Sequence, residues 1–207
     1  MYNMNKKQYW ENVFQTKKPN EVSWTEKHPK TSLDCINALT VDKKLPIIDI
    51  GGGDSYLVDV LLEKGYTDIS VLDISEKALQ RAQDRLGSRS NEITWIVSDV
   101  LDFTPQKKYA VWHDRASFHF LTQSEDILKY TQLVNQVVSN ALVIGTFSTS
   151  GPIKCSGLPI TQYNCAHLSK NFEGEFEMLN CVEVTHTTPF DTLQNFIFGS
   201  LQKRTKE

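Results

Sequence analysis

Three consecutive glycines constrain this chain most strongly, because they lie at a turn between a strand pattern and a helix pattern. The apolar run Ile47 to Ile50 leads directly into Gly51, Gly52 and Gly53. Apolar side chains then recur on one face of a helix over residues 55–64, at Leu57, Val58, Leu61 and Leu62. Glycine has no Cβ, so its backbone can approach a bound molecule closely. Open α/β sheets bind ligands where their strands end, so this turn predicts a ligand site.

The alternation of strand and helix patterns continues along the chain. Short apolar runs typical of buried strands cover residues 69–72, 93–97, 109–113 and 141–147. Ser75 is placed to cap a helix that stops at Gly87, and Ser124 opens another helix with an apolar face. Repeated strand–helix–strand units favour a parallel sheet with helices on both faces.

The two ends of the chain depart from this alternation. Residues 8–14 and 32–39 predict helices ahead of the sheet, whereas residues 176–184 and 194–201 predict two strands without a helix between them. Such a pair favours an antiparallel edge. We therefore expect an α/β, Rossmann-like, mostly parallel sheet with an antiparallel C-terminal strand pair. A length of 207 residues suits one domain, with residues 1–40 as a helical lid and residues 45–207 as the core.

Composition argues against several kinds of partner and site. A formal net charge of −3 and scattered basic pairs give no surface for a polyanion, so we do not expect nucleic acid as a partner. The chain starts with polar residues and has no apolar run near the roughly 20 residues that span a bilayer, so we expect no membrane segment and a cytoplasmic location. No Cys-x-x-Cys pair occurs, which argues against a metal site and favours reduced thiols at Cys35, Cys155, Cys165 and Cys181.

The residues around the glycines indicate which nucleotide binds there. A dinucleotide fingerprint, Gly-x-Gly-x-x-Gly, would place its third glycine where Tyr56 stands. Asp49 before the glycines and Asp54 after them are unfavourable neighbours for phosphate, and no Gly-Lys-Ser/Thr follows. Carboxylates suit a ligand that carries an ammonium group and no phosphate, as S-adenosylmethionine does.

Two further acids end the next two strands. Asp73 stands 24 positions after Asp49, where a carboxylate can accept two hydrogen bonds from ribose hydroxyls. Asp99 follows the third strand and can accept from an adenine amino group. A single acid of this kind is commonly a turn or cap residue. Three at successive strand ends favour a nucleoside site.

These runs resemble the class I S-adenosylmethionine-dependent methyltransferases over essentially the whole chain. In that family the glycine loop faces the methionine part of the cofactor, while the acids matching Asp73 and Asp99 hold ribose and adenine. The segments around Trp10 and Trp24 are similar to those of small-molecule and protein-lysine methyltransferases, whose N-terminal helices cover the cofactor. For Trp24, a core or lid-packing aromatic is the alternative. The resemblance implies cofactor binding by Trp24, Asp49, Gly51, Gly52, Gly53, Ser55, Asp73, Ile74, Asp99, Val100 and His113.

The acceptor side is predicted at residues 112–120, which begin where the fourth strand ends. His113 and Asp114 can polarise or deprotonate an acceptor, with His113 the better placed. Arg115 can bind an anionic substrate or pair with a neighbouring acid, and His119 lies farther on. The alternatives are a structural Asp114–Arg115 ion pair and a packing histidine at His119. The run Trp-His-Asp-Arg-Ala is similar to one in bacterial methyltransferases.

The sequence leaves the acceptor open among three hypotheses. The first is an enzyme that methylates oxygen, nitrogen or sulfur of a small metabolite; the second methylates a protein lysine; the third is a regulatory domain that binds cofactor without catalysis. The Asp/Asn-Pro-Pro-Tyr/Phe and Pro-Cys signatures of other acceptor classes are absent. Cys155 is a ligand for a soft substrate or an ordinary loop cysteine. Tyr163 and His167, four positions apart, are expected on one face of a helix.

Overall fold

Seven strands of the protein form one sheet in the order β3-β2-β1-β4-β5-β9-β8. We used a computed structural model, which describes residues 5–205. The first five strands pair in parallel, and β9 pairs antiparallel with both β5 and β8. The expected fold class is therefore confirmed. The strands are β1 (Ile47–Ile50), β2 (Ile69–Asp73), β3 (Ile93–Val97), β4 (Tyr109–Arg115), β5 (Val138–Phe147), β8 (Phe176–Thr187) and β9 (Leu193–Lys203).

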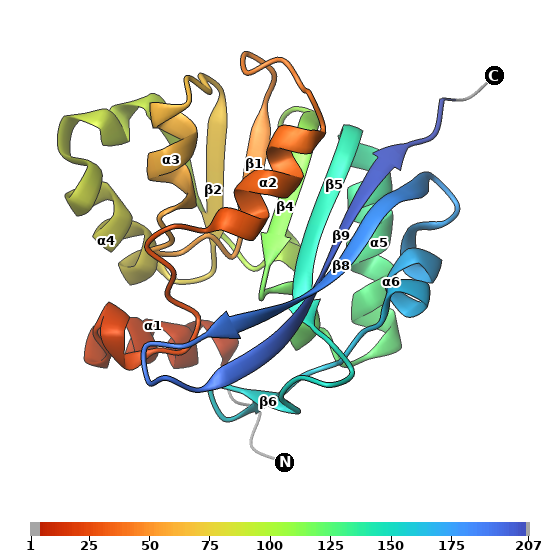
Figure 1. Cartoon of the computed structure of the whole chain (residues 1–207). Coiled ribbons are helices and arrows are strands. Elements are labelled where there is room, and N and C mark those ends of the chain that lie inside the picture. Colours follow the sequence, from red (N-terminus) through yellow and green to blue (C-terminus); the bar gives the residue numbers. More distant parts are fainter. Residues whose placement is uncertain (1–4, 206–207) are drawn as a thin grey trace.

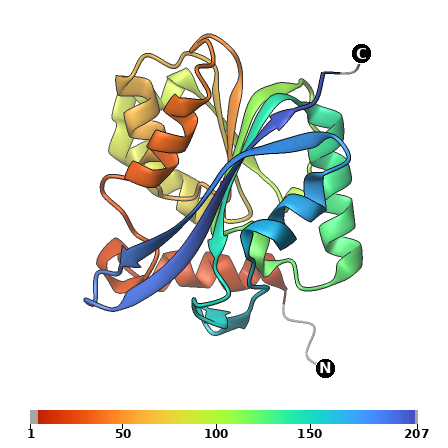
Figure 2. The ribbon, with the colours of Figure 1, turned by 45° about the vertical axis from the view of Figure 1, so that its right-hand side comes forward.

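Helices cover both faces of this sheet. Figure 2 shows α2, α3 and α4 on one side of the strands, and α5 and α6 on the other. Helix α1 lies at the edge toward which β4 points (Figure 1). The helices are α1 (Lys6–Thr16), α2 (Lys30–Ala38), α3 (Leu57–Glu63), α4 (Glu76–Leu86), α5 (Ser124–Val137) and α6 (Cys165–Phe172). Short 3-10 turns are Pro19–Glu21, Gly87–Glu92, Val100–Asp102 and Phe118–Phe120, and β6 (Lys154–Cys155) pairs with β7 (Leu158–Pro159).

The predicted ends of α4 are confirmed in atomic detail. The Ser75 hydroxyl accepts a hydrogen bond from the backbone N–H of Ala78, which satisfies a donor that the first turn leaves free. The helix ends at Leu86, and Gly87 follows with a φ of 58°. Glycine adopts this left-handed conformation without a Cβ clash.

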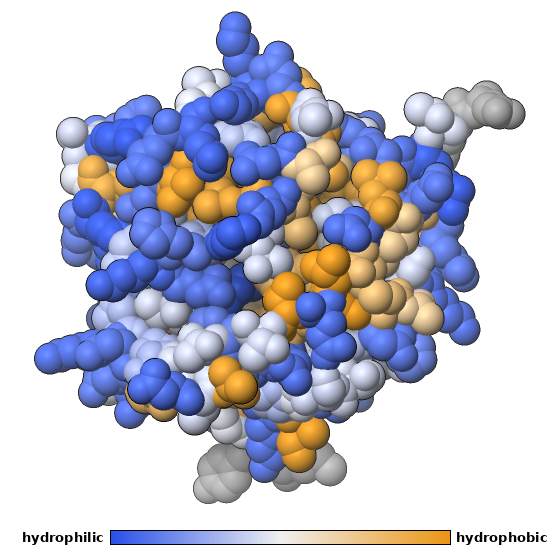
Figure 3. Space-filling view, viewed as in Figure 1, coloured by the Kyte–Doolittle hydropathy of each residue, from blue (hydrophilic) through white to orange (hydrophobic). Residues whose placement is uncertain are grey.

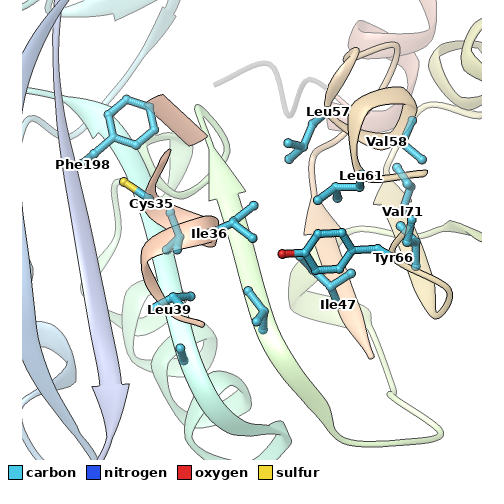
Figure 4. Close-up of a cluster of buried hydrophobic side chains, with 14 of the residues drawn as sticks. Cys35, Ile36, Leu39, Ile47, Leu57, Val58, Leu61, Tyr66, Val71 and Phe198 are labelled. Atoms are coloured by element: carbon cyan, nitrogen blue, oxygen red, sulfur yellow. The ribbon is translucent and has the colours of Figure 1, made fainter. Parts of the chain in front are cut away.

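Two apolar clusters fill the spaces between the sheet and its helices. The first cluster joins α2 and α3 to the sheet, as Figure 4 shows. Its members include Cys35 and Ile36 of α2, Leu39 just after α2, Leu57, Val58 and Leu61 of α3, and Ile47 and Val71 of the sheet. The second cluster lies under α5 and α6 and contains Trp112, Phe118 and Tyr130. Burying one such large side chain contributes about 1.5–3 kcal/mol. These clusters hold the strand ends, and the side chains on them, in fixed positions.

The N-terminal helix is attached to the sheet through α4. The Glu11 carboxylate accepts from the backbone N–H of Glu76 at 2.8 Å and from the Ser75 hydroxyl at 3.1 Å. An acid at this end of a helix is stabilised by the helix dipole. Arg81 of α4 donates to the backbone carbonyl groups of Phe14 and Lys17. These contacts fix α1 beside the carboxyl ends of β1 and β2.

Two expectations about the C-terminal half are wrong. Cys165 and Cys181 form a disulfide rather than remaining as reduced thiols, because α6 packs on β8 and brings their Cα atoms to 5.9 Å. Nothing in a 16-residue separation indicates this pairing. Tyr163 and His167 do not share a helical face, because α6 begins only at Cys165; Tyr163 is buried in a bridge to Ser148.

The surface is mostly hydrophilic, with apolar side chains gathered beside α2 and over β5, β9 and β8 (Figure 3). Among residues 5–205, the structure contains no helix that is both long and apolar enough to cross a bilayer. No group of three His, Cys, Asp or Glu side chains in that range is arranged to hold a metal ion.

Candidate active site

The glycine loop packs so tightly that side chains would not fit in it. A Cβ at Gly52 would lie 2.6 Å from Asp49 Oδ2 and 2.7 Å from Val71 Cγ1. Gly51 and Gly53 have φ angles of 62° and 47°, which disfavour other residues. The Gly52 N–H donates to the carbonyl of Leu72, which ties the loop to β2. The loop therefore forms a wall made of backbone at the carboxyl edge of the sheet.

Acidic side chains surround this wall, as the sequence predicts. Asp49 and Asp73 are almost fully buried, at 4% and 6% exposure. Asp73 accepts one hydrogen bond, from the Ser75 N–H at 2.8 Å. Burial raises the pKa of Asp73 to about 7, opposed by that hydrogen bond and reinforced by the charges of Asp54, Asp49 and Glu11. Its carboxylate is thus poised to gain stability from additional donors, such as ligand hydroxyls.

One pocket joins the glycine loop to the ends of β2, β3 and β4. It is lined by every residue expected to bind cofactor: Trp24, Asp49, Gly51, Gly52, Gly53, Ser55, Asp73, Ile74, Asp99, Val100 and His113. Arg115 and Cys155 line it as well. An aromatic wall closes one side, with Trp10 5.2 Å from Phe120 and 5.9 Å from Trp24 between ring centroids.

His113 lines the pocket, but both of its ring nitrogens already have partners. Nδ1 lies 2.7 Å from Asp49 Oδ1, and Nε2 lies 2.9 Å from the Ser32 hydroxyl of α2. The ring is 2% exposed. The observed contacts therefore hold Asp49 in place beside the glycine loop.

Asp114 and His119 lie away from the pocket, which differs from their expected place on the acceptor side. Successive side chains of a strand point to opposite faces, so Asp114 faces α5 while His113 and Arg115 face the pocket. Its carboxylate accepts from the Ser117 and Phe118 N–H groups and from the Tyr130 hydroxyl. His119 is fully buried and stacks on Phe147, with ring centroids 4.8 Å apart. Burial and the nearby Arg115 charge lower its pKa to about 3, so it is neutral.

Arg115 lines the pocket beside the N-terminal segment. Nη1 donates to the Trp24 carbonyl at 2.9 Å, and Nη2 lies 3.2 Å from Glu26. Its predicted pairing with a neighbouring acid thus occurs with Glu26 rather than with Asp114. Burial lowers the pKa of Arg115, opposed by the charges of Glu26, Asp49 and Cys155. Burial also raises the pKa of the Cys155 thiol to about 11, which leaves it protonated.

Comparison with known proteins identifies the domain that contains the glycine loop. Residues 47–140, which include the glycine loop, Asp73 and Asp99, match the family described as methyltransferase domain. This part of the chain is a class I S-adenosylmethionine-dependent methyltransferase domain.

Curated relatives align with stretches of this chain that differ in length. Malonyl-[acyl-carrier protein] O-methyltransferase 2 of Ilyobacter polytropus is 29% identical over 85 residues, 41% of this chain and 32% of the relative. The eEF1A lysine and N-terminal methyltransferase of Mus musculus is 28% identical over 174 residues, 81% of this chain and 23% of the relative. The chain thus spans less than a third of the length of either relative.

Solved methyltransferases share the fold. Magnesium protoporphyrin IX methyltransferase from Synechocystis, with bound S-adenosylmethionine, has a TM-score of 0.72 at 15% identity and covers 99% of this chain and 100% of its own. The N-methyltransferase NodS from Bradyrhizobium japonicum, in complex with S-adenosylhomocysteine, has a TM-score of 0.71 at 12% identity, covering 96% and 98%.

S-adenosylmethionine is the cofactor of this methyltransferase family, and the pocket fits it. The glycine loop presents backbone instead of side chains to the pocket, and the buried Asp73 carboxylate accepts a hydrogen bond from Ser75, which leaves it able to accept more. Carboxylates also offset the positive charges of a sulfonium and an ammonium group. Arg81, which pairs with Asp54 at 3.2 Å, also donates to two backbone carbonyls, so it is not free to bind a phosphate.

Several residues of the methyltransferase pocket were not found from the sequence. Phe14 comes from α1, Ser32 from α2 and Glu26 from the connection between them. No local pattern points to these positions, because they reach the pocket only after the N-terminal segment folds over the strand ends. The tryptophans of that segment, Trp10 and Trp24, are the useful indication, and both line the pocket.

Proposed function

We propose that this methyltransferase transfers a methyl group to a small-molecule acceptor held in the same pocket as the cofactor. The observation that supports this most strongly is the continuity of the pocket. One pocket is lined by the glycine loop and Asp73 as well as by Arg115 and Cys155, and the aromatic wall forms part of the same lining. An acceptor in such a space is positioned and kept from water, which supplies most of the rate acceleration for a simple displacement.

We assign the cofactor contacts residue by residue as part of this proposal. The glycine loop and Asp49 face the methionine part, Asp73 accepts from the ribose hydroxyls, and Asp99 accepts from the adenine amino group. Asp99 already accepts one hydrogen bond from the Leu101 N–H at 2.9 Å, which fixes its orientation. When bound, S-adenosylmethionine supplies an electrophilic methyl group on its sulfonium.

Base catalysis is assigned a smaller part than the sequence suggests. His113 would have to break its contact with Asp49 or with Ser32 before it could accept a proton. His119 has no exposed surface, and Asp114 faces the opposite side of the sheet. This arrangement favours an acceptor that is already deprotonated at neutral pH, for which proximity suffices.

The N-terminal residues 1–40 are proposed to act as a lid over the cofactor. Trp10, Phe14 and Trp24 line the pocket from this segment, and α1 is attached to α4 through Glu11 and Arg81. Residues 1–4 of the expected lid lie outside the described residues. Movement of such a segment admits and encloses ligands.

A protein lysine is the second candidate acceptor. The Mus musculus relative is named for lysine methylation, and its alignment covers 81% of this chain. A regulatory domain that binds cofactor without turnover is the third candidate. The three differ in where a transferred methyl group appears.

One labelling experiment separates these candidates. The protein is incubated with methyl-labelled S-adenosylmethionine and a cell extract, and label is measured in the low-molecular-weight and protein fractions. We expect label in small molecules, and its loss in Asp73→Ala but not in Asp102→Ala, an exposed acid on a neighbouring turn. Label confined to proteins would favour lysine, and no transfer by a cofactor-binding protein would favour regulation.

A further inference from the structure

The acceptor end of the pocket contains a buried cluster of charged residues that cofactor binding does not use. The cluster consists of Arg115, Glu26 and His186, with Thr25 beside it. Glu26 Oε1 lies 3.2 Å from Arg115 Nη2 and 2.9 Å from His186 Nδ1, so one oxygen serves both basic side chains. Arg115, Glu26 and Thr25 line the pocket, and the Arg115 side chain is only 13% exposed.

Arg115 presents one unsatisfied edge of its guanidinium group. Nη1 is engaged by the Trp24 carbonyl, whereas Nε and Nη2 are both buried without a hydrogen-bond partner. These two nitrogens share the edge that pairs with a carboxylate through two parallel N–H···O bonds. Glu26 contacts Nη2 without hydrogen-bond geometry, since its oxygen is directed to His186. The hydroxyl of Thr25, which precedes Glu26 and lines the same pocket, is also buried without a partner.

Glu26 is shared between two basic side chains. Burial favours neutral Glu26, but His186 and Arg115 hold the pKa of Glu26 below its usual range. His186 Nε2 lies 2.7 Å from the Ser23 carbonyl, which can only accept, so this nitrogen carries a proton. Glu26 Oε1 faces His186 Nδ1 as well as Arg115, and it leaves both Nε and Nη2 of Arg115 without a hydrogen bond.

The two ends of the pocket consequently offer a ligand different partners. Asp49, Asp54 and Asp73 line one end, and the open edge of Arg115 lies at the other. A carboxylate bound there would satisfy both free nitrogens of Arg115.

We propose that the acceptor molecule carries a carboxylate, which Arg115 binds through Nε and Nη2 after displacing Glu26 from Nη2. The proposal rests on the assignment of a small-molecule acceptor to this pocket. The Thr25 hydroxyl supplies a further donor to the same carboxylate. Arg115 thereby acts as a specificity-determining residue that selects carboxylic acids over neutral and cationic metabolites.

A fractionated extract tests this with the unmodified protein. Low-molecular-weight cell extract is separated on an anion exchanger at neutral pH, and each fraction is incubated with the protein and methyl-labelled S-adenosylmethionine. We expect acceptor activity in the retained fraction. That activity should be lost after the carboxylates in the fraction are converted to methylamides with methylamine and a carbodiimide. Phosphatase treatment of the same fraction should leave the activity unchanged.

The outcomes distinguish failure of the carboxylate proposal from failure of the proposed small-molecule methyltransferase function. Acceptor activity only in the unretained fraction, or activity that survives amidation, would overturn the carboxylate and leave a small-molecule methyltransferase. Loss on phosphatase treatment would replace carboxylate by phosphate and overturn the inference as stated. No label in either fraction would overturn the proposed small-molecule function itself.

Variants of Arg115 then test the residue. Arg115→Met should lower kcat/KM for the retained acceptor about 10- to 100-fold, since hydrogen bonds to charged groups change equilibrium constants by about that factor. Affinity for S-adenosylhomocysteine should stay the same, which also shows that the variant is folded. Arg115→Lys keeps the charge without the two-pronged edge and should recover only part of the loss. Arg89→Met, an exposed arginine paired with Glu92, is the matched control. An Arg115→Met protein with unchanged KM would refute the assignment.

Discussion

Replacing Asp114 by alanine tests whether this residue supports the fold instead of the chemistry. Its carboxylate accepts hydrogen bonds at 3.1, 3.0 and 2.7 Å from the Ser117 N–H, the Phe118 N–H and the Tyr130 hydroxyl. Its side chain has no exposure to water. Alanine would leave these three donors buried without an acceptor. Each such donor costs about 1–3 kcal/mol, so we expect a loss of about 3–5 kcal/mol once local relaxation is included.

Urea unfolding followed by tryptophan fluorescence measures this loss. For a chain of this length it corresponds to a lower Tm by roughly 6–20 °C. Tyr130→Phe is the matched variant, because it removes one of the three hydrogen bonds and the acceptor of the Trp112 N–H. That variant should lose about 1–3 kcal/mol. An Asp114→Ala protein of normal stability but without turnover would refute the structural assignment and return Asp114 to the chemistry.

Three further predictions follow from the cofactor end of the pocket. Folding raises the pKa of Asp73 from 3.8 to about 7, so the folded protein favours the protonated side chain. The stability that Asp73 contributes to the free protein is therefore fully present below about pH 4 and is lost as pH rises through about 7. Affinity for S-adenosylhomocysteine should rise over the same range, because ribose hydroxyls need the carboxylate, and calorimetry on Asp73→Asn should show a flat profile. Gly52→Ala should abolish this affinity because its Cβ would lie 2.6 Å from Asp49 Oδ2; measurable binding would show that the loop yields. Deleting residues 1–24 should leave a cooperatively unfolding sheet with weakened cofactor binding, and full activity after the deletion would remove Trp24 from the site.

The cofactor end could be predicted because it depends on strand ends alone. Parallel strands place their carboxyl ends at one edge, so Asp49, Asp73 and Asp99 are brought together by any right-handed strand–helix–strand fold. The glycine run marks the strand from which they are counted. This part of the site therefore requires only the order of elements, which local patterns in the sequence supply.

The acceptor end could not be predicted in the same way. His113, Asp114 and Arg115 are adjacent in sequence, yet strand alternation sends the middle one to the opposite face, where Tyr130 engages it. Which face is which depends on the helix that covers it, and the sequence does not show this. Glu26 and His186 are 160 positions apart and meet only because the β8–β9 hairpin reaches the N-terminal segment. The disulfide could not be predicted either, because Cys165 and Cys181 meet only when α6 packs on β8.

Calorimetric titration with S-adenosylhomocysteine tests the central claim most directly. The wild-type protein and Asp102→Ala should bind with equal affinity, while Asp73→Ala should lose about 1.5–3 kcal/mol, roughly 10- to 150-fold, for its hydrogen bonds to the ribose. Titration of the same proteins with NAD should give no heat. Unchanged affinity in a folded Asp73→Ala protein would place the cofactor elsewhere and contradict the account of this pocket.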